Sequence, residues 1–334
     1  MTKKYEPDAV DLRLIHALQI DPRASWSDLA PVVGADAVTL ARRWHRLSSG
    51  GLAWVSAYRP GQSRSTFALI EVECSPGSAV ATFEALAQLP DVISVDFTAG
   101  SRDLIVTLVA KTEQDVTTFL LHGWGEFPSI RAARTHLVTD IIKEGGAWRL
   151  RDLTAAEVQR IPSVRPPRAR APKQVPDHLR RVIESELAID GRASTTDIAA
   201  KAGTTSQRVS DAIATMRSKR ELSFRTDIAR PYSGWPVHAW YFMQVPASSI
   251  EKLRDSLARI EEVRLAVRAA SKYNLIMSVW LRNLDDVQRL EVLLEHSIHG
   301  AQIGDRSLVI QTGKHLGRML DDDGRATGMF TPMA

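Results

Sequence analysis

Arginine side chains on one predicted helix are the groups best suited to specific binding chemistry in the first part of the chain. Four residues recur at helical spacing and therefore share one side of that helix: Thr39, Arg42, Arg43 and Arg46. Guanidinium groups in such a row bind phosphate oxygens or the O6 and N7 edge of guanine. His45 lies beside them, where it is placed to contact a phosphate. The pattern indicates a DNA-binding helix, with a solvated charged helix as the alternative.

Two further predicted helices precede this one and would hold it in place. The first has apolar residues at helical spacing, at Val10, Leu14, Ile15 and Leu18. Ser25 and Asp28 have capping-box spacing and open the second helix, which Gly34 ends by turning the chain sharply. Asp36 is a suitable N-cap for the third helix, whose buried face carries Leu40, Trp44 and Leu47. An alternating run over 53–58 follows, so the order is that of a winged helix-turn-helix, whose third helix enters the major groove.

The same order returns in the second half of the chain. Asp21-Pro-Arg-Ala-Ser25 recurs as Asp190-Gly-Arg-Ala-Ser194. Further along, Asp103-Leu104-Ile105 recurs as Asn274-Leu275-Ile276, at nearly the same separation. Because order and spacing are kept over a long stretch, these matches indicate an internal duplication.

The third helix of the second copy is less cationic on the matching side. Thr205 is its expected N-cap, and its expected buried face is formed by Val209, Ile213 and Met216. The positions that match the arginine row, and that we expect to face outward, are Arg208, Asp211, Ala212 and Thr215. An aspartate there would be repelled by phosphates. Three further cations lie toward the next predicted strand, at 222–228, and suit the DNA backbone better than the bases: Arg217, Lys219 and Arg220.

The remaining two thirds of each copy predict the order βαββαβ, which is that of a ferredoxin-like domain. The expected strands cover 66–74, 92–97, 104–110 and 130–138 in the first copy, and 238–245, 263–268, 275–281 and 306–311 in the second. Such a sheet covers one face with helices and must bury the other, so the tandem copy supplies a second sheet. We therefore predict an α+β chain, in which two winged helix-turn-helix domains alternate with two ferredoxin-like domains.

The predicted boundaries are 1–60, 61–143, 176–231 and 232–315 for the four domains, with a linker over 144–175 and a tail over 316–334. Thr154 and Glu157 have capping-box spacing and open a short helix. The linker is rich in proline, which favours an extended conformation of about 3.1 Å per residue. Its cations either touch DNA phosphates or are merely solvated: Arg165, Arg168, Arg170 and Lys173.

This arrangement resembles the Lrp/AsnC (feast/famine) family of prokaryotic regulators, in a tandem form. The residues that carry the resemblance are Asp8-x-x-Asp11-x-x-Leu14-Ile15-x-x-Leu18-Gln19-x-Asp21-x-Arg23, the stretch from Gly34 to Leu47, and Gly100-x-x-Asp103-Leu104. The resemblance implies a DNA-binding domain joined to a domain that pairs sheet to sheet and senses amino acids or similar small metabolites. It also implies double-stranded DNA as a partner and a homo-oligomer of a chain that is itself a pseudo-dimer.

The family's effector pocket lies around the loop between the second and third strands. The resemblance therefore implies effector-binding residues in both copies: Thr98, Gly100, Ser101, Arg102 and Asp103, and Ser271, Lys272, Tyr273 and Asn274. The sequence departs from the family pattern in both loops. Arg102 stands where the family has an aromatic residue, and the second copy has serine for glycine and asparagine for aspartate. The alternative is a polar hairpin turn in each copy.

Composition narrows the function classes further. The 334 residues carry 43 basic and 39 acidic side chains and one cysteine, Cys74, so we expect no intramolecular disulfide. No run of about 18 apolar residues occurs, and the start shows no apolar leader pattern, so we expect a soluble cytoplasmic chain with no membrane partner. His296 and His299 are the only close histidine pair and lack a nearby third ligand. Since no phosphate-loop, nucleophile-elbow or dinucleotide pattern occurs either, we expect no metal, no cofactor and no enzymatic activity.

Two other functions remain open on the same fold. Sirohaem decarboxylases also pair a helix-turn-helix with such a sheet, and Tyr273-Asn274-Leu275 resembles a segment of their third strand. The histidine-rich stretch expected before it is Ala266-Val267-Arg268 here, and the first copy lacks the tyrosine. A protein-interaction scaffold with degenerate DNA-binding domains is the other alternative, and it fits the second copy better than the first.

The two helix-turn-helix domains are predicted to contribute unequally to DNA binding. Replacing Arg42 and Arg43 by alanine should weaken binding to the operator far more than Arg208→Ala does, because the first copy carries the arginine row. A titration of labelled operator at fixed salt measures both losses. Equal losses would contradict the prediction.

Overall fold

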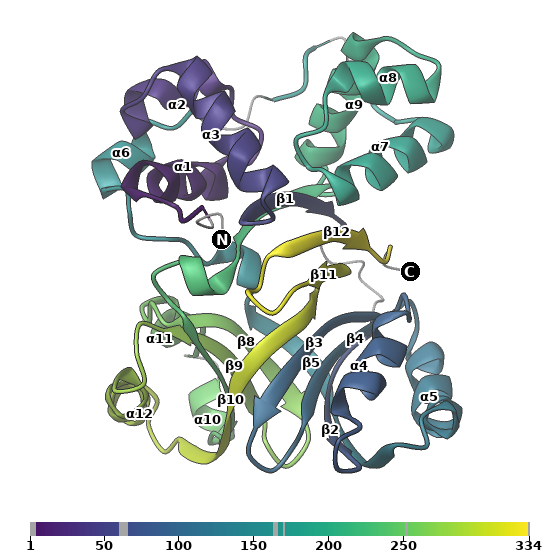
Figure 1. The fold of residues 1–334 in the computed structure, drawn as a ribbon, viewed down its shortest axis with the longest axis vertical. Coiled ribbons are helices and arrows are strands. Elements are labelled where there is room, and N and C mark those ends of the chain that lie inside the picture. Colours follow the sequence, from purple (N-terminus) through teal and green to yellow (C-terminus); the bar gives the residue numbers. More distant parts are fainter. Residues whose placement is uncertain (1–4, 60–65, 163–165, 170, 251–252, 333–334) are drawn as a thin grey trace. The chain divides into compact units, whose positions relative to one another are not determined.

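The computed structural model describes residues 5–59, 66–162, 166–169, 171–250 and 253–332 (Figure 1). The chain folds as two compact units, each assembled from both copies of the repeat. Unit 1 contains residues 1–62 and 149–229, and unit 2 contains residues 63–148 and 230–334. Like parts of the two copies therefore pack together, and the predicted α+β class is confirmed.

Unit 1 holds two three-helix heads, which we call the first and second head. The first consists of α1 (Ala9–Ile20), α2 (Trp26–Val33) and α3 (Ala37–Ser49). The second consists of α7 (Asp177–Ile189), α8 (Thr195–Ala202) and α9 (Ser206–Ser218). Local chemistry sets the helix ends as the sequence predicts, since Asp36 and Thr205 cap α3 and α9. Gly34 (φ 86°) and Gly203 (φ 61°) end the preceding helices in the left-handed conformation that glycine adopts without strain.

The strand that follows each head pairs with its counterpart from the other copy. β1 (Ala53–Tyr58) and β6 (Ser223–Ile228) form a two-stranded antiparallel sheet in which Ala53 is opposite Ile228 and Tyr58 is opposite Ser223. The predicted wing strands are therefore present, and the partner of each is the other copy. This pairing ties the two heads into one unit.

Two arginines of the repeated Asp-x-Arg-Ala-Ser motif are exchanged between the heads. The Arg23 guanidinium donates to the carbonyl oxygens of Gly191 (2.6 Å) and Ala193 (3.2 Å) in the second copy. Arg192 donates in the same way to the carbonyl oxygens of Pro22 (2.7 Å) and Ala24 (3.0 Å) in the first copy. The arginine of the motif thus has the same role in both copies, which is to donate to backbone carbonyl oxygens of the other copy.

From residue 149 onward, the described part of the segment between the copies lies against the heads, whereas its proline content predicted a free extended bridge. Leu150 N–H donates to the Gln19 side chain (2.7 Å), and Leu153 N–H donates to His16 Nδ1 (2.9 Å). Burial lowers the pKa of His16 to about 4, so the ring is neutral and its nitrogen accepts. The predicted capping box at Thr154 is confirmed and opens α6 (Ala155–Gln159). Arg165 and Arg170 lie outside the described residues.

Unit 2 contains the two predicted ferredoxin-like domains. The first copy provides β2 (Thr66–Cys74), α4 (Ala79–Ala87), β3 (Val92–Ala99), β4 (Leu104–Ala110), α5 (Glu113–His122) and β5 (Ile130–Lys143). The second provides β7 (Val237–Gln244), α10 (Ala247–Ile250), α11 (Leu253–Ala258), β8 (Val263–Ala270), β9 (Leu275–Leu281), α12 (Asp286–Ser297) and β10 (Gln302–His315). Residues 251–252 of the helix expected over 250–260 lie outside the described residues.

The strands of both copies join into a closed ring, in the order β10-β3-β4-β2-β5-β8-β9-β7 and back to β10. Closure depends on β5 and β10, which are longer than predicted because each continues beyond its own sheet to pair with the other copy. A ring leaves no unpaired edge among these strands. The predicted tail forms two more strands beside β10, β11 (Arg318–Leu320) and β12 (Ala326–Phe330).

Apolar side chains fill both sides of this ring. Helices α4 and α5 cover the outer face of the first copy, and α11 and α12 cover that of the second (Figure 1). Between the two sheets lies a mixed core that includes Leu69 and Ile105 from the first copy and Trp240 and Phe242 from the second. Each sheet thus buries its helix-free face against the other copy, as the duplicated pattern predicts.

Two lysines at equivalent positions of the repeat also reach across to the other copy. Lys143 Nζ donates to the carbonyl oxygens of Leu257 (3.2 Å) and Ile260 (3.0 Å) at the end of α11. Lys314 Nζ donates to those of Ala87 (2.7 Å) and Leu89 (3.1 Å) at the end of α4. Such ammonium groups satisfy carbonyls that a helix end leaves unpaired. Burial lowers the pKa of Lys314 to about 8.

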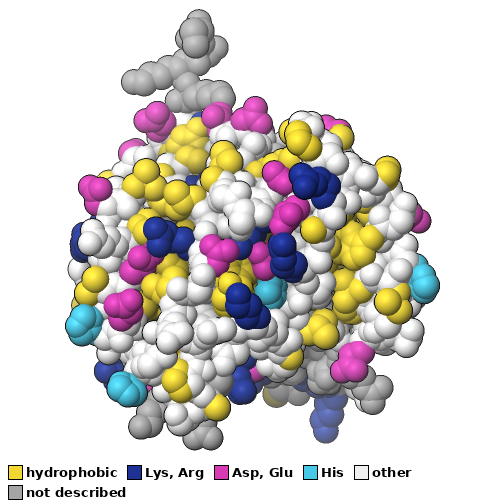
Figure 2. All heavy atoms as spheres, turned by 90° about the horizontal axis from the view of Figure 1, so that it is seen from below, with side chains coloured by type: hydrophobic (Ala, Val, Ile, Leu, Met, Phe, Trp, Pro, Cys, Tyr) yellow, Lys and Arg dark blue, Asp and Glu magenta, His cyan; other side chains and the backbone are white. Residues whose placement is uncertain are grey.

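Charge is mixed on one face of the molecule. On the face shown in Figure 2, basic and acidic side chains lie next to one another near the centre. Over the described residues, no helix has the length and apolar character that a membrane span requires.

Arg192→Ala should lower the free energy of unfolding of unit 1 by about 2 kcal/mol, because it removes two charge-assisted hydrogen bonds and leaves carbonyls unpaired. Urea denaturation followed by circular dichroism measures the change. Arg181→Ala, an exposed arginine on α7, is the matched control and should change the value by less than about 0.5 kcal/mol. A similar small loss in both variants would contradict the proposed role of the exchange.

Candidate functional site

Some residues of the predicted arginine row on α3 are exposed, whereas others have partners within the protein. Arg42, His45 and Arg46 are exposed. Arg43 is half-buried and forms ion pairs with Asp8 (2.8 Å) and Asp11 (2.9 Å) at the start of α1, which raise the pKa of its guanidinium. Arg43 therefore fastens α3 to α1.

Two other predicted members of the row also have partners within the first head. The Thr39 hydroxyl donates to Asp36 Oδ2 (2.6 Å), so Thr39 belongs to the helix cap. The guanidinium of Arg46 lies over the ring of Tyr5, 4.1 Å from its centroid. Of the predicted residues, Arg42 and His45 are the best placed to meet a groove.

Sequence reasoning missed Val38 on the same helix. Its side chain is 78% exposed, and it shares one face with Arg42 and His45 at positions i, i+4 and i+7. An exposed apolar side chain at this place suits contact with a thymine methyl group. The available signal was that Val38 falls outside the apolar spacing of Leu40 and Trp44.

The second head differs from its prediction. Ala212 and Thr215 are buried, whereas both were expected to face outward. The Thr215 hydroxyl donates to the carbonyl oxygen of Pro172 (3.2 Å), and Asp211 pairs with Arg168 (3.8 Å). The segment before α7 covers Thr215, whereas Ala212 belongs to the apolar core of the second head itself. Arg208 is exposed.

The three cations after this row have different surroundings. Arg217 pairs with Asp21 of the first copy (3.0 Å) and lies over the Phe224 ring. It therefore joins the two heads, whereas it was predicted to contact the DNA backbone. Lys219 is exposed and donates to the carbonyl oxygen of Lys173. Arg220 is exposed and takes a positive φ of 57°, at the turn that ends the helix.

In unit 2, one residue of each predicted effector loop fastens that loop to the first strand of its own copy. Cys74 N–H donates to Asp103 Oδ2 (2.6 Å). Asn274 accepts from Val245 N–H (2.8 Å) and donates back to the Val245 carbonyl oxygen (2.8 Å). The conservative change from acid to amide thus keeps one structural role in both copies.

The other loop residues lie in or beside the ring interior. Thr98 is buried and donates to the Arg102 carbonyl oxygen (2.9 Å), and Gly100 takes a φ of 121°. Ser101 accepts from Arg102 Nη2 (3.1 Å). Lys272 is exposed and lies over the half-buried ring of Tyr273, 5.2 Å from its centroid.

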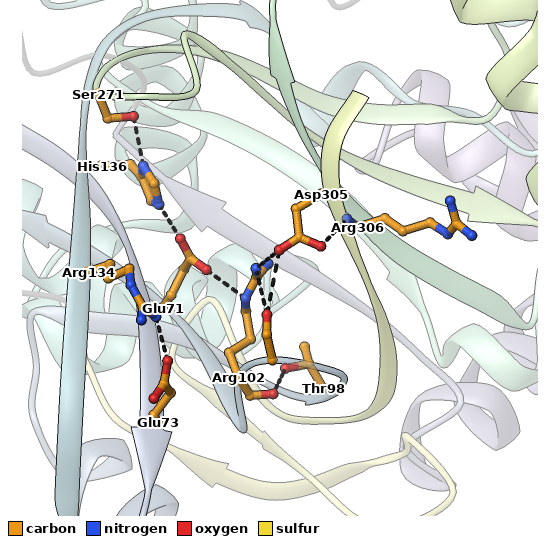
Figure 3. Close-up of polar contacts among 10 residues, drawn as sticks. Glu71, Glu73, Thr98, Arg102, Arg134, His136, Ser271, Asp305 and Arg306 are labelled. Atoms are coloured by element: carbon orange, nitrogen blue, oxygen red, sulfur yellow. Dashed lines mark hydrogen bonds and ion pairs between the residues drawn. The ribbon is translucent and has the colours of Figure 1, made fainter. Parts of the chain in front are cut away.

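A largely buried group of charged and polar side chains, which we call the interior cluster, joins the two loops (Figure 3). It consists of Glu71 on β2, Arg102, His136 on β5, Ser271 and Asp305 on β10. Arg102 pairs with Glu71 (2.6 Å) and Asp305, and its guanidinium lies 4.4 Å from the centroid of the Phe242 ring. His136 lies between Glu71 Oε1 (2.7 Å) and Ser271 Oγ (2.7 Å).

The interior cluster leaves some hydrogen-bonding capacity unused. Arg102 Nη1 and the Ser307 hydroxyl are both buried and have no hydrogen-bond partner among the described residues. Ser307 lies on the same face of β10 as Asp305, whose side chain is 36% exposed. A small ligand that carries a carboxylate would have to displace Asp305 from Arg102 to reach these donors.

Burial also shifts the pKa values of two neighbouring groups, Asp96 and His238. Trp240 Nε1 and the Thr312 hydroxyl donate to Asp96, at 2.9 Å and 2.6 Å, while burial raises the pKa of that carboxyl. Burial also lowers the pKa of His238 well below its ordinary value, so its ring is neutral beside Ser278 (2.8 Å). Among the described residues, no group of three or more His, Cys, Asp or Glu side chains is placed to hold a metal ion.

Glu71→Gln should lower the free energy of unfolding by about 3 kcal/mol, because it leaves the buried guanidinium of Arg102 with less compensation. Thermal and urea denaturation measure the loss. Glu73→Gln on the same strand is the matched control, since its pair with Arg134 is far more exposed and should contribute less than about 1 kcal/mol. Equal losses would show that the interior cluster is no stronger than a surface pair.

Comparison with known proteins agrees with this architecture. Residues 8–48 match the AsnC-type helix-turn-helix domain, and residues 67–148 match the Lrp/AsnC ligand binding domain. An uncharacterized HTH-type transcriptional regulator of Pyrococcus furiosus is 26% identical over 145 residues, which cover 42% of this chain and 97% of that protein. The Bkd operon transcriptional regulator of Pseudomonas aeruginosa is 29% identical over 136 residues, which cover 39% of this chain and 89% of that protein.

A solved structure matches nearly the whole chain. The crystal structure of the siroheme decarboxylase NirDL superposes with a TM-score of 0.58 at 12% identity, over 92% of this chain and 93% of that one. At this identity the likeness concerns the fold, and it extends the family architecture to the second copy. The first half of the chain therefore carries the two domains of Lrp/AsnC regulators, and the second half repeats their fold in tandem.

Proposed function

We propose that the chain is a sequence-specific DNA-binding transcriptional regulator and that unit 2 responds to a small metabolite such as an amino acid. The observation that carries the proposal is the exposed face of α3, where Val38, Arg42 and His45 lie together on a helix that the rest of the first head holds in place. An arginine and an apolar side chain on one face can distinguish guanine from thymine in the major groove.

The ligand response is argued from the interior cluster. Arg102 and Ser307 offer unused donors, and the partly exposed Asp305 is the neighbouring group that a ligand carboxylate could replace on Arg102. The cluster joins loops and strands of both copies, so a ligand there would alter contacts between the copies. Differential binding to two arrangements of the chain would then shift their populations and change DNA affinity.

An enzyme resembling the siroheme decarboxylases is the second candidate, because NirDL shares the fold over nearly the whole chain. The buried His136 is a group that such chemistry could use. Two features favour the regulator. Arg102 is packed on Phe242 inside the ring, and His136 is held between Glu71 and Ser271, so these side chains are engaged with one another.

DNA binding is tested by selecting bound duplexes from fragmented genomic DNA and mapping the protected bases, with and without each amino acid. We expect a discrete protected site and a change of affinity with at least one amino acid. Arg42→Ala should weaken binding about tenfold or more, as expected for one lost base contact. The exposed Arg181 supplies the control variant, R181A. Uniform, unprotected binding at low salt would refute sequence-specific recognition.

The enzyme is tested by adding iron tetrapyrrole and recording the absorbance spectrum and released carbon dioxide. We expect neither a shifted Soret band nor carbon dioxide from this chain. A stoichiometric spectral shift together with decarboxylation would overturn the regulator as the proposed function in favour of the enzyme.

A further inference from the structure

The segment before α7 covers one side of the second head's third helix. We call residues 166–169 and 171–175 the strap. Arg168 of the strap forms an ion pair with Asp211 on α9 (3.8 Å). The Thr215 hydroxyl on α9 donates to the Pro172 carbonyl oxygen (3.2 Å), and Lys219, which follows α9, donates to the Lys173 carbonyl oxygen. At its end, Val175 is buried in the core of the second head.

One of the covered positions, Asp211, matches the base-contacting face of the first head. When the two copies are aligned on their Asp-x-Arg-Ala-Ser motifs, Asp211 and Thr215 match Arg42 and Arg46 of the first head. Thr215 is only 5% exposed, and the side chain of Asp211 is 18% exposed and paired with Arg168. α9 therefore presents no row of arginines on the covered side, and its one acidic group there lies 3.8 Å from the guanidinium of Arg168.

The same arrangement gathers cations at the surface. Four exposed cations, which we call the basic rim, lie along the strap and at the end of α9. They are Arg168, Lys173, Lys219 and Arg220. Between the strap and α9 lies an open hollow of about 450 Å³, lined in part by Arg168, Lys173 and Lys219. No acidic side chain is among the described residues that line it. Its chemistry fits the phosphates of a nucleic-acid backbone.

We propose that the second head binds duplex DNA through the basic rim alone, contacting phosphates and reading no bases. This inference rests on the proposed DNA-binding function and specifies how that function is divided. One chain then recognises sequence through α3 and gains additional, sequence-independent affinity through the strap and α9.

The rim variant K173A/K219A/R220A tests the proposal in the full-length chain. Operator affinity is measured over a range of salt concentrations, together with affinity for a scrambled duplex. Each lost phosphate contact reduces the slope of log affinity against log salt by about 0.9, so the three substitutions should reduce it by about 2 to 3. Affinity for both duplexes should fall by the same factor, and the protected bases should stay the same.

The control variant K111A/R181A/R259A removes the same total charge at exposed positions outside the rim. It should leave the slope within about 0.5 of the unsubstituted chain, since only phosphate contacts release counterions. Equal slopes for the rim and control variants would overturn the inference while leaving the proposed function intact. Failure of the unsubstituted chain to bind DNA would remove the proposed function and this inference with it.

A second variant distinguishes this surface from a cover over a hidden base-reading helix. D211A/T215V removes two attachments of the strap without replacing any rim cation, although Arg168 loses its acidic partner. If α9 reads no bases, the protected region keeps its length and its base preferences. Tighter binding with protection of a second half-site would overturn the inference.

Discussion

Backbone pairing between the two copies is the interaction on which both units depend. In unit 1 each head ends in a single strand, and that strand acquires a partner only because the other copy provides one. In unit 2 the two longest strands each leave their own sheet to complete the other. The reciprocal arginine and lysine contacts have the same effect, since each cation donates hydrogen bonds to carbonyl oxygens of the opposite copy. A copy on its own would expose unpaired strand edges and unsatisfied carbonyls.

The two copies share the contacts that hold their loops and helices in place, and they differ in the side chains that those loops and helices present. Asp103 and Asn274 fasten their loops in the same way, whereas Arg102 and Tyr273, which directly precede them, have different chemistry. The heads show the same division, because α3 and α9 share caps and apolar faces while their remaining faces differ. Shared framework contacts allow such divergence, because stability does not depend on the variable side chains.

Local rules explain what could be predicted from the sequence. Asp36 and Gly34 act within one turn of their own helix, and strand alternation needs only neighbouring residues, so the element order and fold class follow from the sequence. The partner of β1, the burial of Thr215 and the pairing of Glu71 with His136 depend on residues that are distant along the chain. Spacing alone contains no information about such contacts. Glu71 did carry a signal, as one of two acids within a largely apolar strand, but nothing nearby identified its partners.

The interior cluster has a consequence for how the halves can associate. When the repeats are aligned on Asp103 and Asn274, the residues Glu71, Arg102 and His136 correspond to Phe242, Tyr273 and Ser307. Each polar position of one copy thus has an aromatic or small counterpart in the other. Two first copies facing each other would bury two acids and two guanidinium groups without Phe242 to pack against or Asp305 to complete the pairing. Separated first and second copies would therefore form heterodimers in preference to homodimers. Joining the two copies in one chain ensures that each is synthesised with its complementary partner.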